Sequence, residues 1–213
     1  MFLKKTVFAL FFVCLLSSPA FAGDTETPMS RVKEGADKLI KILSDPDMQN
    51  PEKHDAAIRK LRITAEEYID FRLTTMYAVG KKWLKMTPQT QNHLTEAFVQ
   101  LLERTYLKRI PAYGGQQVDY KKEMVSGKKA KVVTEIVDKD KKISVEFRLR
   151  NTGKHWMIYD VVAEGVSLVS NYRTQFAQIL SDGTPEDLIK LIQDRIEKLD
   201  KGEDDTPDDN IKG

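Results

Sequence analysis

The stretch from Trp156 to Phe176 most constrains the fold, because it starts as a strand and ends as a helix. Its first part, Trp156–Val162, is rich in aromatic and β-branched residues, which suit a buried strand. Gly165 interrupts the strand, and Ser167 is a residue type that caps helices. The apolar residues that follow at helical spacing are Leu168, Val169, Tyr172 and Phe176. This segment therefore joins a sheet to a helical layer and lines the space between them from both sides.

The middle of the chain has the two-residue period of β-structure. In Ile143–Arg150, apolar and polar residues alternate, so one side must be buried and the other solvated. Short polar or glycine-bearing segments between the strand-like runs indicate hairpin turns. The four predicted strands are Val118–Val125, Ala130–Val137, Ile143–Arg150 and Trp156–Val162. They predict an antiparallel meander whose apolar face needs helices to cover it.

Helical spacing dominates on both sides of this meander. The predicted helices are Ser30–Ser44, one with Pro51 as its first residue, Phe71–Trp83, one that starts at Thr87-Pro88, one capped by Ser167, and Glu186–Leu199. Twisted sheets wrap around helices laid on one face. We therefore predict an α+β fold in which a curled four-stranded antiparallel sheet is covered by helices.

The N-terminus has the pattern of an export signal. Lys4 and Lys5 precede the apolar run Val7–Leu16, and Ala20-Phe21-Ala22 follows as a cleavage site. The apolar run is short for a membrane span, which leaves an uncleaved anchor as the alternative. We predict a signal peptide over residues 1–22 that is cleaved after Ala22. A single domain over 23–199 and a disordered acidic tail over 200–213 would follow.

The composition of the mature chain excludes several classes of function. Cys14 is the one cysteine and lies in the signal, so the mature chain has no disulfide and no thiolate site. Removing Lys4 and Lys5 from the 34 Lys and Arg residues leaves 32, equal to the 32 Asp and Glu residues. A nucleic-acid-binding protein normally carries a basic excess, so we expect no nucleic-acid partner.

The sequence offers little for catalysis or metal binding. His54, His93 and His155 have no metal-ligand spacing, so we expect no metal. Asp160, within an apolar strand, and Glu164, at the strand–helix junction, are the two candidates for a general base in a pocket. The interpretation we favour is structural: Asp160 points outward, and Glu164 binds backbone amides near the helix start. No catalytic residue is then expected.

Apolar residues on several predicted elements are able to face one interior. They are Met76, Val79, Phe98, Leu102, Tyr106, Val145, Phe147, Leu149, Trp156, Ile158, Val166, Leu168, Val169 and Tyr172. A filled core and a lined cavity use the same residue types, so the pattern alone leaves both open.

One long motif resembles a known family. The run W-M-I-Y-D-V-V-A-E-G-V-S-L-V-S-N-Y-R-T-Q-F is similar to the signature of the periplasmic phospholipid-binding proteins of the bacterial lipid-asymmetry (Mla) system, also called the toluene-tolerance auxiliary family. A looser resemblance covers about Val32–Leu199 and includes Phe98–Tyr106. It implies a cone similar to nuclear transport factor 2, with acyl chains held by the apolar residues named above. Tyr172 and Arg173 are candidate headgroup contacts, and the alternative for Arg173 is a solvated helix residue.

The resemblance also implies a function and partners. It implies a phospholipid carrier of the periplasm, not an enzyme, with lipid as cargo and no cofactor. The implied partners are an inner-membrane ABC transporter with an MCE-type substrate-binding subunit and an outer-membrane lipoprotein complex. Two alternatives stay open, namely an exported enzyme that uses Asp160 or Glu164 as a base and a solid-core adaptor that bridges membrane complexes.

Overall fold

The computed structural model describes residues 26–106, 114–139 and 141–203. Four α-helices precede the sheet, and two follow it. They are α1 (Pro28–Leu43), α2 (His54–Tyr68), α3 (Phe71–Val79), α4 (Pro88–Tyr106), α5 (Leu168–Asp182) and α6 (Pro185–Lys201). Two short 3₁₀ helices lie between them, η1 (Pro46–Met48) and η2 (Gly80–Lys85).

The sheet is an antiparallel meander in which each strand pairs with the next. Its strands are β1 (Gln117–Ser126), β2 (Lys129–Asp138), β3 (Lys141–Asn151), β4 (Trp156–Ala163) and β5 (Val166–Ser167), in the spatial order β1-β2-β3-β4-β5. The predicted α+β class is confirmed, and so is the antiparallel order. The predicted number of four strands was wrong, because the sheet has five.

The missed strand β5 forms a tight hairpin with β4. Ser167 pairs with Val162, and Val166 pairs with Ala163. The two residues between them, Glu164 and Gly165, have φ angles of 50° and 83°. Positive φ at both central residues is the geometry of a two-residue type I′ turn. Glutamate is not a usual residue at such a turn, so Glu164-Gly165 is a weak hairpin signal.

The helices begin where capping groups are available, with one departure from prediction. Ser167 caps α5 as predicted, since its side chain accepts a hydrogen bond from the Ser170 amide. The prediction that α2 begins at Pro51 was wrong, because the helix starts at His54. The Asn50 side chain instead accepts the Glu52 amide at 3.0 Å, and this local turn occupies the residues before α2.

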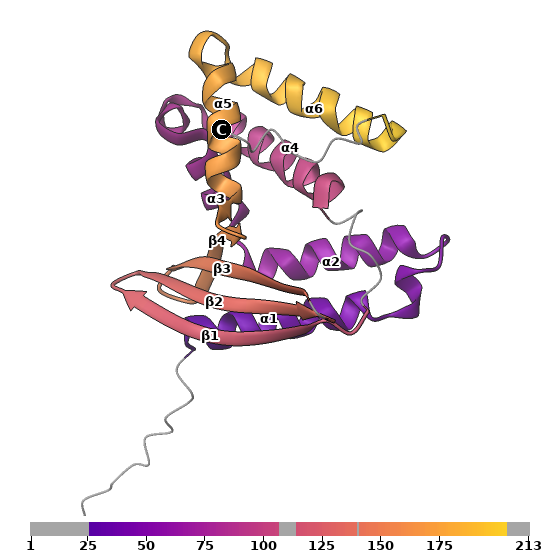
Figure 1. Ribbon diagram of the computed structural model, residues 1–213. Coiled ribbons are helices and arrows are strands. Elements are labelled where there is room, and N and C mark those ends of the chain that lie inside the picture. Colours follow the sequence, from indigo (N-terminus) through magenta and orange to yellow (C-terminus); the bar gives the residue numbers. More distant parts are fainter. Residues whose placement is uncertain (1–25, 107–113, 140, 204–213) are drawn as a thin grey trace, which may run out of the picture.

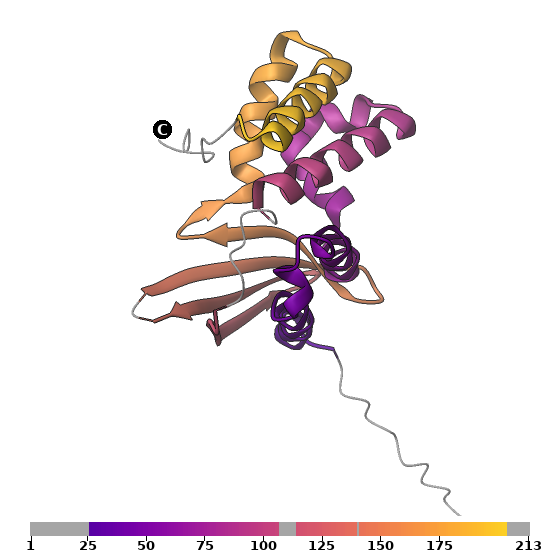
Figure 2. The same ribbon diagram turned by 90° about the vertical axis from the view of Figure 1, so that its right-hand side faces the viewer.

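The elements form two groups, each with its own apolar core. Figure 1 shows α3, α4, α5 and α6 gathered on one side and the sheet with α1 and α2 on the other, and Figure 2 shows the same separation. One buried cluster includes Phe98, Tyr172 and Ile192 and lies within the helical group. The sheet group has a cluster around Val132 and Leu149, and α1, η1 and α2 form another cluster of their own.

Strand β4 connects the two groups. The amide of Asp70 donates to the carbonyl of Ile158 at 2.8 Å, and the Thr74 hydroxyl donates to the carbonyl of Tyr159 at 3.0 Å. These bonds hold the start of α3 against β4, while α5 continues directly from β5. The helical group is therefore attached to the sheet through the same strand on two sides.

Some predictions lie outside the described residues. The predicted signal peptide, residues 1–22, is one, and so are residues 204–213 of the predicted tail. Helix α6 continues to Lys201, and Gly202 follows it as a left-handed cap. Within the described ranges, none of the helices has the length and apolar character to cross a bilayer.

Candidate functional site

A pocket of about 530 Å³ lies between the helical group and the sheet group. Helices α2, α3, α4 and α5 contribute to its wall, together with strands β4 and β5. The lining residues are Arg62, Ala65, Ile69, Phe71, Thr74, Val99, Leu102, Glu103, Tyr106, Ile158, Tyr159, Asp160, Val161, Ala163, Val166, Leu168 and Asn171. Most of them are apolar, so the pocket offers its occupant dispersion contacts and few hydrogen bonds.

Asp160 is a buried carboxylate in the wall of this pocket, with an exposed fraction of 3%. One carboxylate oxygen accepts from the Arg148 guanidinium at 3.0 Å and from the Ser167 hydroxyl at 2.7 Å. The other accepts from the Val169 amide in the first turn of α5 at 3.0 Å. The prediction that Asp160 points outward was wrong, because β4 buries the face that carries it.

Glu164 has a different role from the predicted one. Its carboxylate is exposed and accepts from the amide of Ser144 in β3 at 2.7 Å, not from an amide of α5. The role that was predicted for Glu164, binding an amide at the helix start, belongs to Asp160. A carboxylate in that position is stabilised by the partial positive charge of the helix N-terminus.

The Asp160 carboxylate is part of a chain of charges on the sheet. Arg148 lies directly opposite Asp160 in the β3–β4 register and also donates to Glu146 at 2.8 Å. Burial raises the pKa of Glu146, but the hydrogen bonds from Arg148 and Lys131 outweigh burial and hold that pKa below its ordinary value. Glu146 is therefore ionised at neutral pH, and its carboxylate helps to hold the Arg148 guanidinium in place.

Tyr159 gives the pocket wall a neutral polar group. Its ring meets that of Tyr77 edge to face, with the centroids 5.0 Å apart. Burial raises the pKa of Tyr159, and the neighbouring Tyr77 raises it further. The phenol is therefore protonated at physiological pH and adds no charge to the wall.

Five of the predicted interior residues line the pocket, namely Leu102, Tyr106, Ile158, Val166 and Leu168. The remaining predicted residues do not line it. Val79, Phe98 and Tyr172 fill the helical core, with Met76 packed against them. Leu149 and Trp156 fill the sheet core, with Phe147 against them. Val145 and Val169 are buried elsewhere in the fold.

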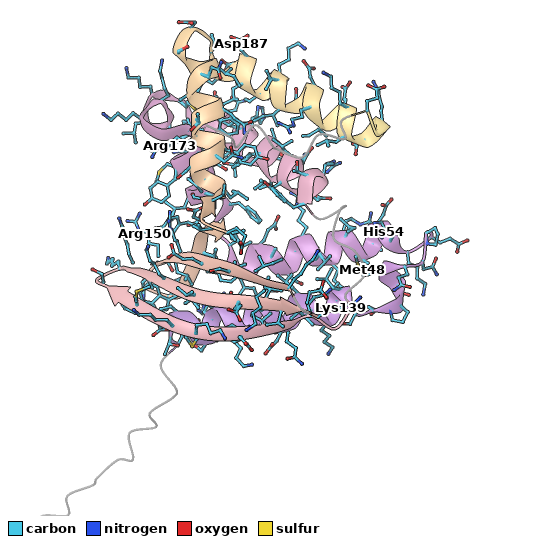
Figure 3. The ribbon with its side chains drawn as sticks, viewed as in Figure 1. Met48, His54, Lys139, Arg150, Arg173 and Asp187 are labelled. Carbon is cyan, nitrogen blue, oxygen red and sulfur yellow. The ribbon has the colours of Figure 1, made fainter. Side chains whose placement is uncertain are left out.

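Arg173, one of the candidate headgroup contacts, lies on α5 but does not line the pocket. Figure 3 labels it beside α5 in the helical group, and its side chain is exposed. Its guanidinium lies beside Gly80, where an added Cβ would come within 3.2 Å of Nη2. The arrangement places this cation next to η2 and away from the pocket wall.

Sequence reasoning missed the contribution of α2 and of the segment that follows it. Arg62 and Ala65 on α2, Ile69 after it, and Phe71 and Thr74 on α3 all line the pocket. Val99 on α4 was missed too, although it stands in helical register with Leu102 and Tyr106. The three- and four-residue spacing of Val99, Leu102 and Tyr106, opposite the polar side of the helix, was the sequence signal that could have identified Val99.

Metal ligation has no support in the described residues, where no three histidine, cysteine or acidic side chains gather around one point. The Nδ1 atom of His54 lies 2.9 Å from the carbonyl of Met48, and that of His155 lies 2.8 Å from Glu26. These partners come from separate parts of the fold.

The fold and pocket define a class, namely an α+β protein with an open antiparallel sheet and an apolar pocket between sheet and helices. The chain matches the family model described as MlaC protein over residues 33–194, and it belongs to that family. Among solved structures, it is similar to the phospholipid-binding protein from Ralstonia solanacearum, solved in complex with a phospholipid. The TM-score is 0.73 at 24% identity, over 82% of this chain and 99% of that chain, which shows a shared fold.

Proposed function

We propose that this protein is a periplasmic phospholipid carrier that holds acyl chains in the pocket between its two groups of elements. The observation that carries the proposal is the apolar pocket of about 530 Å³. Its volume lies within the roughly 300–1,000 Å³ of ligand sites, and an apolar cavity of ~150 Å³ already holds one benzene ring. Membership of the MlaC family and the similar phospholipid-binding protein support the same ligand class.

The energetics of hydrocarbon transfer suit a carrier. Burying one methylene group is worth about 0.8 kcal/mol, so two chains of ~16 carbons gain about 25 kcal/mol relative to water. A bilayer offers the same chains nearly the same gain. The net difference between pocket and membrane is therefore small, and a carrier can load and unload when it docks.

We infer that the carrier works between two membranes. The predicted signal peptide supports export, and the resemblance supports an inner-membrane ABC transporter with an MCE-type subunit and an outer-membrane lipoprotein complex as its partners. Shuttling between them would maintain the lipid asymmetry of the outer membrane. We further propose that the curled sheet and its helices form a cone similar to nuclear transport factor 2 around the lipid.

Native mass spectrometry of the mature protein purified from cells tests the proposal. We expect mass additions that match phospholipids and the same lipids in an organic extract. A protein at its bare mass, with no extractable lipid, would contradict it. Delipidated protein incubated with vesicles should regain the added mass.

The alternatives have less support. As a general base Asp160 has little free capacity, because its two oxygens already accept three hydrogen bonds from the fold. A solid-core adaptor would need side chains that meet between the sheet and the helices. The pocket lies where those side chains would have to be.

A further inference from the structure

A second, polar groove of about 490 Å³ adjoins the apolar pocket. Four residues line both, namely Arg62, Ile69, Phe71 and Val99. The groove itself is lined by groups that form hydrogen bonds or carry charge, including Arg72, Asn92, Thr95 and Glu96. An apolar chamber beside a polar one matches the two parts of an amphiphile.

Helix α4 runs along both spaces with one face. Asn92, Thr95 and Glu96 line the groove, Val99 lies at the boundary, and Leu102 and Tyr106 line the pocket. These residues follow three- and four-residue steps, so they share a side of the helix. At 1.5 Å per residue, the face from Asn92 to Tyr106 is about 21 Å long. Its polar end and its apolar end therefore belong to one continuous surface.

Arg72 is held in the groove by neutral partners. Its Nη1 donates to the Asn92 side chain at 3.1 Å, and its Nη2 donates to the Gln91 side chain at 2.6 Å. Its guanidinium carbon lies 5.3 Å from the ring centroid of Trp83. Gln91 is itself oriented, because its amide nitrogen donates to the Trp83 carbonyl at 2.9 Å.

The charge of Arg72 is not neutralised by any described carboxylate. A guanidinium has five N–H donors, and the hydrogen bonds to Asn92 and Gln91 leave the other donors of Arg72 without a partner among the described residues. A fixed, planar cation with spare donors is the group that binds phosphate best among side chains. Arg72 is therefore the candidate phosphate-binding group of this groove.

The other charged residues of the groove differ in whether they have an ion-pair or hydrogen-bond partner. Arg62 pairs with Glu66 at 3.1 Å and with Glu103 at 3.7 Å. Asp70 caps α3 by accepting the Leu73 amide at 2.8 Å. Glu96 forms no ion pair within the described part of the chain, and it lies one helical turn from Asn92, about 6 Å along the axis. One unneutralised cation and one unneutralised anion thus face the same groove.

We propose that this groove binds the zwitterionic headgroup of a phospholipid, with its phosphate on Arg72 and its ammonium group at Glu96. The tails would extend along α4 past Val99 into the apolar pocket. The inference rests on the proposed lipid-carrier function and adds a headgroup site and a preference for zwitterionic over anionic lipids.

The test uses delipidated mature protein and vesicles of equal parts phosphatidylethanolamine and phosphatidylglycerol with identical acyl chains. Bound lipid is identified by mass spectrometry after gel filtration. We expect the unmodified protein to enrich phosphatidylethanolamine about threefold over the vesicle. Arg72→Gln should lower loading of both lipids about tenfold at limiting vesicle concentration. Glu96→Gln should keep total loading and lose the enrichment.

Matched controls separate this site from general charge effects and from misfolding. Arg59→Gln and Glu52→Gln change exposed residues outside both spaces and should leave loading and enrichment unchanged. Arg72→Lys keeps the charge but loses the planar fork, so its loading should be intermediate. Diacylglycerol has tails and no phosphate, so Arg72→Gln should load it normally, which also shows that the variant is folded.

Three results would overturn the headgroup site while leaving the carrier intact. They are normal phospholipid loading by Arg72→Gln, retained enrichment by Glu96→Gln, and binding of glycerophosphoethanolamine as tight as that of the intact lipid. The last result would assign the groove to a soluble phosphate compound. If the unmodified protein loads neither phospholipid nor diacylglycerol, the carrier function fails and this inference fails with it.

Discussion

Asp160 connects a strand, a hairpin and a helix through one carboxylate. It accepts from Arg148 on β3, from Ser167 in β5 and from the Val169 amide in α5. Arg148 keeps about a third of its side chain exposed, while that of Asp160 is almost fully buried. Removing the carboxylate therefore leaves a helix amide and a partly buried guanidinium without their acceptor.

We expect Asp160→Ala to lower the free energy of unfolding by about 2 kcal/mol, measured by urea denaturation. Glu164→Ala is the matched control, because its carboxylate is exposed and accepts one amide; it should cost well under half as much. Equal effects from the two changes would contradict the structural role given to Asp160.

Glu146 makes stability depend on acidic pH. Its pKa lies below the ordinary value of 4.5 in the folded state, so its ionised form stabilises the fold. That contribution is complete above about pH 4.5 and is lost as the pH falls through the folded-state pKa. The difference in unfolding free energy between the unmodified protein and Glu146→Gln should therefore be constant from pH 7 to 5 and shrink toward pH 3. A difference that grows on acidification would contradict this assignment.

Sequence reasoning worked for single residues where the evidence was local. Ser167 was identified as a cap from its position before a helical run. The side of the sheet to which Asp160 points was not predicted correctly. Apolar residues stand on both sides of Asp160 in β4, and the sequence does not reveal the irregularity in the β3–β4 register. Arg148 as its partner depends on strand register, which two separate segments determine together.

At the level of elements, the walls of the pocket come from helices and strands that are far apart in the chain. Periods of two and of 3.6 residues located most strands and helices, because each depends on neighbours along the chain. The same periods did not separate core from pocket. Phe98 and Leu102 share one helix, yet Phe98 is in the core and Leu102 lines the pocket. That difference depends on where α2 and β4 lie relative to α4.

We expect Ala65→Trp to block lipid loading and to leave the fold intact, because the indole would enter the pocket from α2. Unfolding free energy should change by less than about 1 kcal/mol, and native mass spectrometry should show little added lipid. Leu149→Trp is the contrasting variant, since Leu149 is fully buried in the sheet core. It should overpack and destabilise by about 1–3 kcal/mol. Normal loading by Ala65→Trp would show that the tails lie elsewhere.

At the level of the whole molecule, the described residues build separate apolar clusters. The helical group has one cluster, and the sheet with α1 and α2 has two. The pocket lies between two groups that each have their own apolar core. The side chains around the pocket therefore pack against the core of the group to which they belong.

Bound lipid should raise the midpoint of thermal unfolding, because a ligand that binds only the folded state stabilises that state. At 100 times the dissociation constant the gain is about 2.7 kcal/mol, which corresponds to roughly 5–10 °C for a chain of this size. Scanning fluorimetry of loaded and delipidated protein measures the shift. Ala65→Trp incubated with the same vesicles should show no shift, and a shift of similar size in that variant would point to lipid bound outside the pocket.

The division of the interior into independently packed groups has a consequence for the working cycle. Neither group needs a ligand to fill its core, so emptying the pocket is not expected to unfold either group. In the proposed carrier function, the empty protein would therefore keep its fold after it releases lipid and could load lipid again.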